Sequence, residues 1–459
     1  MQPFIAEQPR FTREQEIRRA MLRVVAAGSQ PELALLAGVT EREWRGQLQW
    51  LDISGMALYF FDRLQGLRRS DLLPPSMLLR LEANLADNAL RTRGMIAKAA
   101  GIRDAFEQEE LNFALLKGIS LSPDAVARPE LRSQLDIDFL VAQEDITQAR
   151  KILERHGYYL HAIAGRTWEF KTHAVPSSSM KDLYRDVPWG SIDLHAEATT
   201  REHRSRLALR EKRWVEGVEM PVLCACDAFI GQGLHLFKHV SSSHYRASHL
   251  VEFHRYLQTC SRDESFWPQV EARAMETGAA GAAWALGIVT LLAEQLLGEC
   301  APENFARWTL NRLSPPLRLW VEMYGWRTAL GGIPGNKLYA LLVRELEKEG
   351  LEAHRAAPNS ARAPETVSEV KAELRSARGS LVPKRLPPMV LRGQAGEPLR
   401  TRAARFRLQL RFLLLRLHFH LVEGLRFLLE SRRWKRRLRE IEGKDSPAIC
   451  PANKGMTIR

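Results

Sequence analysis

Apolar side chains recur at helical spacing over the first hundred residues. Two stripes follow the i, i+4, i+7 rhythm of a helix that buries one face. One consists of Trp44, Leu48, Leu51, Gly55 and Leu58, and the other of Leu78, Leu81, Leu85, Ala89 and Ile96. The pair Pro74-Pro75 separates them, since proline ends helices. We therefore predict a helical N-terminal region over residues 1–110.

From residue 113 the pattern changes to short runs with the period of two that is typical of strands. Leu135, Ile137, Phe139 and Val141 alternate with polar or charged neighbours in the run LDIDFLV. We predict strands at 113–117, 135–141, 158–162, 167–174 and 190–196. Asp145 is expected to cap a helix that ends at Gly157. A small mixed β-sheet core over residues 111–226 follows from this pattern.

The rest of the chain returns to helical periodicity. Residues 227–350 are expected to form a helical domain, in which the uncharged run 277–293 is a buried helix, because its 17 residues fall short of a membrane span of about 20. Residues 351–400 show no period and are predicted to be a disordered linker. Residues 401–441 are predicted to form one basic amphipathic helix. The fold class is thus α/β in the mixed, α+β sense.

The charge of the chain is concentrated in this tail. The whole chain carries +13, whereas residues 371–459 hold 22 Lys and Arg against 7 Asp and Glu, so residues 1–370 sum to −2. In 401–441 the leucines line a wide apolar surface rimmed by arginines. This combination favours an anionic membrane surface as partner, with docking onto a partner protein or onto the protein's own body second and nucleic acid third.

The cysteines and the N-terminal residues indicate the cellular compartment of the protein. Five cysteines form no CxxC pair and no even framework, and the first residues lack the apolar segment of a signal peptide. We expect a cytoplasmic protein, attached peripherally at the inner membrane face if the tail binds lipid.

Two carboxylates on the second predicted strand carry the chemistry. Asp136 and Asp138 point the same way from a strand that is otherwise apolar, because side chains alternate faces. They repel each other unless a divalent metal lies between them, and Mg²⁺ favours such oxygen ligands. The competing interpretation is an exposed edge strand whose polar residues face water.

Two flanking segments complete the pattern. Gly118-Ile119-Ser120 follows the strand 113–117, and a glycine with a small hydroxyl residue at a strand end lets backbone N–H groups approach a phosphate. Asp193 and His195 share one face of the strand 190–196, so Asp193 supplies a third carboxylate for a two-metal site. His195 is interpreted as a general base or as a hydrogen-bond partner that holds a carboxylate.

Lys117 and Arg132 flank the same segments. Both are candidates to neutralise a triphosphate, Arg132 through paired hydrogen bonds and Lys117 as a point charge. The alternative is a strand-end lysine and a loop arginine in water.

Taken in order, these segments resemble the uncharacterised bacterial nucleotidyltransferase family of the polymerase-beta-like superfamily. The resemblance rests on LLKGIS, on RSQLDIDFLV, on the HGY that ends the intervening helix and on IDLH, and covers roughly residues 30–260. It implies that Asp136, Asp138 and Asp193 bind Mg²⁺ or Mn²⁺ and that Gly118 and Ser120 contact the phosphates of an NTP. Ile119 departs from the usual turn, in which glycine is followed directly by Gly or Ser.

A histidine-rich segment follows the core. His235 and His239 stand four residues apart on a predicted helix, and His244, His249 and His254 follow. Such a pair can chelate zinc, but the segment lacks the Glu of HExxH and has no thiolate at ligand spacing. We therefore expect ordinary helix packing.

Three functions are compatible with the sequence. The first is a metal-dependent nucleotidyltransferase that moves a nucleotidyl group from an NTP to an acceptor such as a sugar, a metabolite or a protein hydroxyl. An NTP-dependent phosphotransferase would use the same metals. The third is a non-catalytic interaction or scaffold protein that keeps the fold, which the insertion of Ile119 favours.

Overall fold

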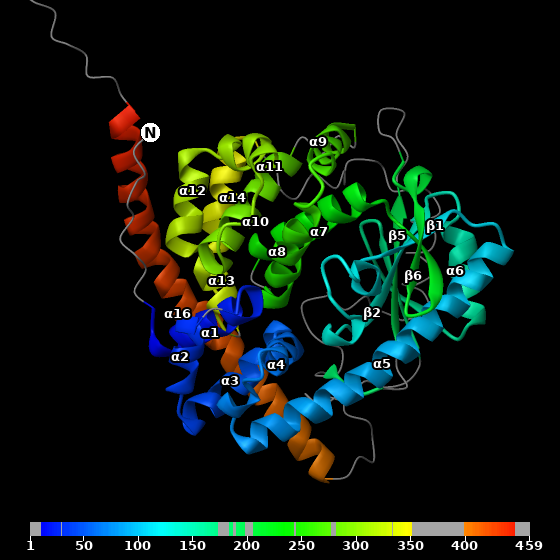
Figure 1. Cartoon of the computed structure of the whole chain (residues 1–459), viewed down its shortest axis with the longest axis horizontal. Coiled ribbons are helices and arrows are strands. Elements are labelled where there is room, and N and C mark those ends of the chain that lie inside the picture. Colours follow the sequence, from blue (N-terminus) through cyan, green and yellow to red (C-terminus); the bar gives the residue numbers. More distant parts are fainter. Residues whose placement is uncertain are drawn as a thin grey trace, which may run out of the picture.

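The computed structural model describes residues 11–28, 30–172, 183–186, 190–197, 205–242, 245–276, 281–332, 334–350 and 399–445. A seven-stranded mixed sheet stands on one side of a larger helical body (Figure 1). This confirms the predicted fold class. The predicted linker 351–400 lies outside the described residues except for its last two.

The sheet has the order β3-β4-β5-β2-β1-β7-β6. Its strands are β1 (Phe113–Leu116), β2 (Asp136–Ala142), β3 (Tyr159–Ala164), β4 (Thr167–Lys171), β5 (Ser191–Glu197), β6 (Glu211–Val215) and β7 (Val218–Val222). The first five confirm the predicted strands, although residues 173 and 174 lie outside the described residues. The hairpin of β6 and β7 is a feature that the alternation pattern did not predict.

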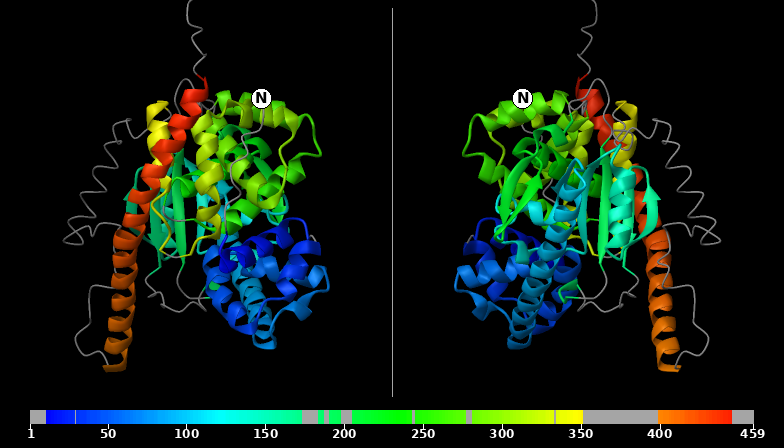
Figure 2. Two further views of the ribbon diagram at one scale, coloured as in Figure 1. Left: turned by 90° about the vertical axis from the view of Figure 1, so that its left-hand side faces the viewer. Right: turned by 90° about the vertical axis from the view of Figure 1, so that its right-hand side faces the viewer.

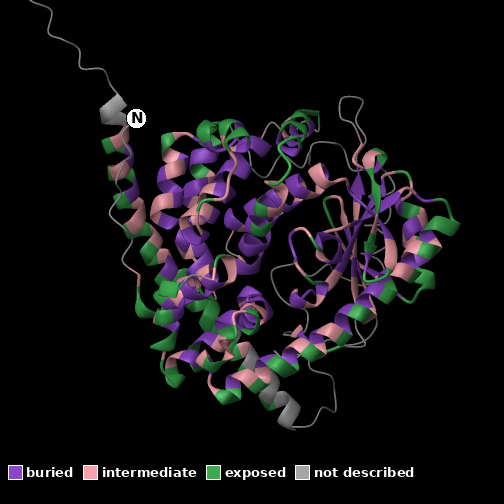
Figure 3. Cartoon of the chain, in the orientation of Figure 1, coloured by how far each residue is buried: buried purple, intermediate pink, exposed green. Residues whose placement is uncertain are grey.

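Helices on one face of the sheet enclose its main core. Ile137, Phe139 and Val141 of β2 pack there against α5 (Pro75–Gln108) and α6 (Ile146–Arg155). The opposite face carries Asp136, Asp138 and Leu140, and both faces of the central strands are largely buried (Figure 3).

Asp145 precedes α6 as expected, but the predicted cap is wrong. Its side chain makes no capping hydrogen bond and instead accepts a hydrogen bond from the backbone N–H of Asn112, 2.8 Å away. The carboxylate therefore fixes the loop that leads into β1, and α6 begins without a side-chain cap.

Helices from before and after the sheet share a single large core. The earlier ones are α1 (Arg13–Ala26), α2 (Gln30–Ala37), α3 (Glu41–Ser54) and α4 (Ala57–Gly66). The later ones are α7 (Ala225–Val240), α8 (Ala247–Cys260), α9 (Phe266–Glu276), α10 (Ala282–Leu297), α11 (Glu303–Trp308), α12 (Pro315–Trp320), α13 (Trp326–Leu330) and α14 (Tyr339–Lys348). The uncharged run contributes the buried α10, and no helix among the described residues is long and apolar enough to cross a membrane.

The tail forms α16 (Leu399–Asp445), which runs along the helical body and projects past it at its N-terminal end (Figure 2). Its C-terminal half docks through Trp434, which is 2% exposed, and through Glu423, Phe427 and Leu438. The predicted leucine stripe faces away from the body. Its exposed members are Phe406, Leu410, Leu413, Leu417, Leu421, Leu425 and Leu428.

Candidate functional site

The register of two neighbouring strands places two of the predicted carboxylates side by side. β2 lies between β1 and β5, so the interpretation of β2 as an exposed edge strand is wrong. β2 and β5 are parallel, with Asp138 directly beside Asp193 and Asp136 beside Ser191. Residues in register on neighbouring strands point to the same face, so Asp136, Asp138 and Asp193 share one side of the sheet.

Asp138 is the hub of the polar contacts. Lys117 Nζ donates to Asp138 Oδ1 at 3.1 Å, and His195 Nε2 lies 2.7 Å from the same oxygen. Thr167 Oγ1 lies 3.2 Å from the other ring nitrogen, His195 Nδ1. Burial opposes ionisation of Asp138, but the hydrogen bond from His195 and the charge of Lys117 together hold its pKa well below the ordinary value. His195 thus holds a carboxylate, which was one of its two predicted roles.

The other two carboxylates behave in the opposite way. Burial, followed by the negative charges of Asp138 and Asp136, raises the pKa of Asp193 to about 7. Burial and the charge of Asp138 also raise the pKa of Asp136. The charge of Asp138 thus raises the pKa of both neighbouring acids, and a bound cation would relieve this repulsion.

The donor atoms of this cluster fit a divalent cation. One ligand atom each from Asp138, Asp193 and His195 lie within 4.8 Å of one another. Asp136 lies outside this closest group but on the same face. Carboxylate oxygens suit magnesium and manganese, whereas an imidazole nitrogen suits zinc. The carboxylates of this cluster therefore fit the metal that the sequence predicts.

The predicted phosphate turn has an unusual backbone. Lys117 and Gly118 both have positive φ angles, +48° and +47°. The positive φ favours glycine at position 118, and a Cβ atom there would also force the Gln134 side chain to shift. Ser120 donates both its N–H and its hydroxyl to the carbonyl of Lys117, each at 2.8 Å. Strain in a non-glycine residue beside a carboxylate cluster is typical of functional sites.

Arg132 is buried rather than in water. Its side chain is 12% exposed, and its Nε donates to Glu252 Oε1 at 3.2 Å. Tyr59 and Gln232 donate to the same fully buried carboxylate. Arg132 therefore joins the loop before β2 to α4, α7 and α8, and its charge also acts on Asp136 and Asp138.

Sequence reasoning missed several residues that complete the site. Glu252 lies on α8, 120 residues from Arg132, and no local pattern connects the two. Glu169 and Thr167 were within reach of the alternation pattern, because they lie on one face of β4 opposite Asp193 and His195.

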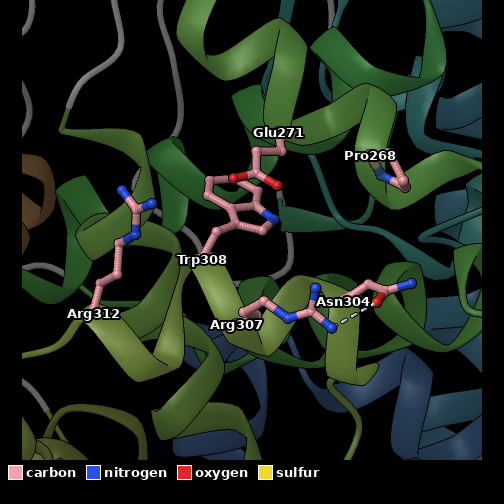
Figure 4. Close-up of a pocket in the computed structure, with 6 residues that line it drawn as sticks. All are labelled: Pro268, Glu271, Asn304, Arg307, Trp308 and Arg312. Carbon is pink, nitrogen blue, oxygen red and sulfur yellow. Dashed lines mark hydrogen bonds between the residues drawn. The ribbon is translucent and has the colours of Figure 1, made fainter.

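One surface depression lies elsewhere, on the helical body (Figure 4). Pro268, Glu271, Asn304, Arg307, Trp308 and Arg312 line it. None of them comes from the strands that carry the carboxylates, so this depression is separate from the candidate site.

Comparison with known proteins adds a family assignment to this geometry. No curated protein matches the chain. A family model described as an uncharacterised nucleotidyltransferase matches residues 40–298, more than half of the chain, and this span contains β2, β5, Lys117 and Glu252. The chain therefore belongs to this family of uncharacterised nucleotidyltransferases.

Proposed function

We propose that the protein is a metal-dependent nucleotidyltransferase that moves a nucleotidyl group from an NTP to an acceptor hydroxyl. The observation that carries this proposal is the parallel register of Asp138 and Asp193, which brings a buried carboxylate, a half-buried carboxylate and His195 within ligand distance of one another. In the transfer, the acceptor oxygen bonds to the α-phosphorus, the bond to pyrophosphate breaks, and the acceptor hydroxyl loses its proton.

Asp136, Asp138 and Asp193 would hold the metal, Mg²⁺ or Mn²⁺. Bound there, such ions supply charge stabilisation for the attacking and leaving oxygens. Lys117 and His195 fix the orientation of the Asp138 carboxylate through their shared contact with Oδ1. This preorganisation keeps the carboxylate from rotating when substrate enters.

Phosphate recognition is assigned to the segment that joins β1 to the 3-10 helix η2 (Gly118–Leu121). Lys117 Nζ has three N–H donors, so it would keep its contact with Asp138 and also donate to a phosphate oxygen, while Gly118 permits close approach of the backbone. Ser120 can contribute only if its hydroxyl leaves the carbonyl of Lys117. Arg132 would support this segment indirectly, because it donates at 3.0 Å to Gln134 Oε1, which lies next to Gly118.

The decisive experiment follows the label of two NTP preparations. The full chain is incubated with Mg²⁺, a panel of candidate acceptors and NTP labelled at the α- or the γ-phosphate. We expect α-label in the product. Product that carries γ-label would instead establish the alternative phosphotransferase, and no transfer of either label to any acceptor would favour the non-catalytic scaffold.

Variants make this assay specific to the site. Asp138→Asn and Asp193→Asn should each abolish labelled product. Asp104→Asn is a matched control, because Asp104 is an exposed carboxylate on α5 that contacts only Arg103 among the described hydrogen bonds and ion pairs. Equal activity in all three variants would contradict the assignment of the carboxylates.

For the tail, we propose attachment to an anionic membrane surface through the outward stripe of α16. The exposure of Leu413, Leu417 and Leu421 supports this, since the docked face of the helix is a different one. The full chain should bind anionic vesicles, more weakly at high salt but measurably, because apolar insertion is not screened.

The triple change of Leu413, Leu417 and Leu421 to Ser tests the apolar contribution to this binding. It should weaken binding to the vesicles and leave only a component that high salt removes, because the arginine charges remain. Unchanged binding of the triple variant would contradict the proposal, and concentration-dependent dimers that the variant loses would point to a second copy as partner.

A further inference from the structure

Three histidines from two helices meet beside the candidate active site. His235 and His239 lie one turn apart on α7, and His249 lies near the start of α8. Their ring centroids are 4.6, 5.1 and 5.1 Å apart. One nitrogen atom from each ring lies within 4.8 Å of the other two. The helical pair was visible in the sequence, but the third ring comes from the next helix and requires the fold.

The spacing of these nitrogens suits a tetrahedral metal. His235 Nε2 and His239 Nε2 are 3.2 Å apart, and ligands 2.0–2.1 Å from a tetrahedral zinc ion are separated by about 3.3 Å. His249 is only 4% exposed, and its Nδ1 has no hydrogen-bond partner among the described residues. A buried, unpaired ring nitrogen is costly unless something binds it.

The surroundings are compatible with neutral imidazoles as ligands. Burial, reinforced by Lys117, lowers the pKa of His235, and burial with neighbouring imidazole and arginine charges lowers that of His249. Metal binding requires the unprotonated ring. The positive charges of Arg132 and Arg246 act on the histidine cluster. The carboxylates of Asp138 and Glu252 partly balance them, Asp138 at His235 and Glu252 at Arg246.

We propose that His235, His239 and His249 bind a zinc ion that fastens α7 to α8. Three imidazole nitrogens leave a fourth position for water, which is the ligand set of an open zinc site. Mg²⁺ is not the expected occupant, because it prefers oxygen ligands. The site is separate from the proposed Mg²⁺ site in its residues, and it does not depend on nucleotidyl transfer being the reaction.

The test uses metal content and spectroscopy rather than activity. The full chain, purified without added metal, should contain about one zinc per chain, the stoichiometry of a single site with three imidazole ligands. After removal of the metal with a chelator, added Co²⁺ should give the visible absorption of a tetrahedral site. His239→Ala should lose both signals, and His249→Gln should as well. His156→Ala is the matched control, because His156 is an exposed histidine on the far side of the sheet core, at the end of α6.

Asp193→Asn distinguishes the two metal sites. This variant should keep both the zinc content and the Co²⁺ spectrum. If Asp193→Asn loses them while His239→Ala retains them, the metal belongs to the carboxylate cluster and the proposal fails. Purified wild type that lacks zinc and develops no visible band with Co²⁺ would also overturn it, leaving a hydrogen-bonded histidine cluster. Circular dichroism of each variant shows whether the loss of metal reflects a loss of fold.

Discussion

Asp138 and Asp193 lie side by side on β2 and β5, yet their surroundings act on them in opposite directions. Asp138 has two cationic or donating partners, Lys117 and His195, and its pKa is lowered. No partner of this kind contacts Asp193 among the described residues, and its pKa is raised to about 7 by burial and then by neighbouring acids. One carboxylate is therefore stabilised as an anion in the metal-free protein, and the other is not.

Replacing Asp193 with Asn should stabilise the metal-free protein at high pH. The unfolded chain ionises Asp193 near pH 3.8, whereas the folded chain does so near 7. The resulting destabilisation is absent below the unfolded pKa, grows between the two values and is complete above the folded one. Asp193→Asn should thus raise the melting temperature clearly at pH 8 and less at pH 5. An equal shift at both pH values would contradict the raised pKa.

The matching change at Asp138 should have the opposite effect. Asp138→Asn removes the charged acceptor of Lys117 and weakens the contact with His195. It also removes the negative charge that raises the pKa of Asp136 and Asp193, which offsets part of this loss. We expect a loss of about 1–3 kcal/mol in the free energy of unfolding at pH 7, which is typical of a buried donor deprived of its acceptor. Urea denaturation measures it, and a variant as stable as the wild type would show that these contacts contribute little.

The parts of the site that the sequence predicted are those fixed by local geometry. The period of two on a strand placed Asp136 and Asp138 on one face, and the same period placed Asp193 with His195. That the strands of Asp138 and Asp193 are neighbours was predicted only because both strands alternate apolar and acidic positions. Glu252 and His249 could not be predicted, because their contacts with Arg132 and His235 depend on how α8 packs against the loop before β2 and against α7.

At the scale of single elements, α16 docks onto the body through one face and exposes its apolar stripe on another. Two acidic residues of this basic helix, Glu423 and Glu430, face the body: Glu423 is buried, and Glu430 accepts from Tyr324 Oη at 3.1 Å and pairs with Arg327. Trp434 Nε1 donates to Glu345 at 3.2 Å. The apolar stripe of exposed leucines faces outward. Both the docking onto the body and the free apolar surface that the sequence suggested therefore occur, on different faces.

Two substitutions in α16 should differ sharply in their effect on stability. Trp434→Ala empties a buried position and should cost about 3–5 kcal/mol. Leu417→Ala changes a side chain that is 52% exposed and should alter the free energy of unfolding by no more than about 0.5 kcal/mol. Urea denaturation of both variants provides the comparison. Similar losses would mean that the leucine stripe is covered in solution, as it would be in a dimer.

Regular patterns predicted most elements, and irregular ones were missed. β2 and β5 were visible as apolar alternation, and β1 as a compact apolar run. β6 was hidden because its residues EKRWV are mostly exposed and charged. The turn after it, Glu216-Gly217, adopts positive φ at both residues, which is typical of a tight hairpin. That dipeptide was the available signal for the hairpin.

At the scale of the whole molecule, two cores are joined by one long helix. Met77 and Leu81 of α5 pack in the core of the helical body, and Ile102 and Phe106 pack against the sheet. Between them lie buried polar residues, among which Asn88 donates to the carbonyls of Glu130 and Arg132. The helices before and after the sheet also share one core. The sheet is therefore an insertion in the sequence of the helical body.

This arrangement predicts that the described body and sheet unfold together. Calorimetry of the full chain should show a single main transition, because neither core is complete without α5. Leu81→Ala in the body and Ile102→Ala at the sheet should both lower the temperature of that same transition. Two resolved peaks, each shifted by only one of these substitutions, would show instead that the cores unfold independently.

The geometry of the candidate site also depends on the number of residues in α5. Leu81, Asn88, Met95 and Ile102 are spaced by seven, so one continuous side of α5 meets the body first and the sheet afterwards. A helix turns by about 100° and advances 1.5 Å with each residue. A single alanine inserted between Asn88 and Met95 would therefore rotate the sheet's attachment by more than a quarter turn relative to the body. Arg132 would then lose its alignment with Glu252, although no residue of the site had been changed.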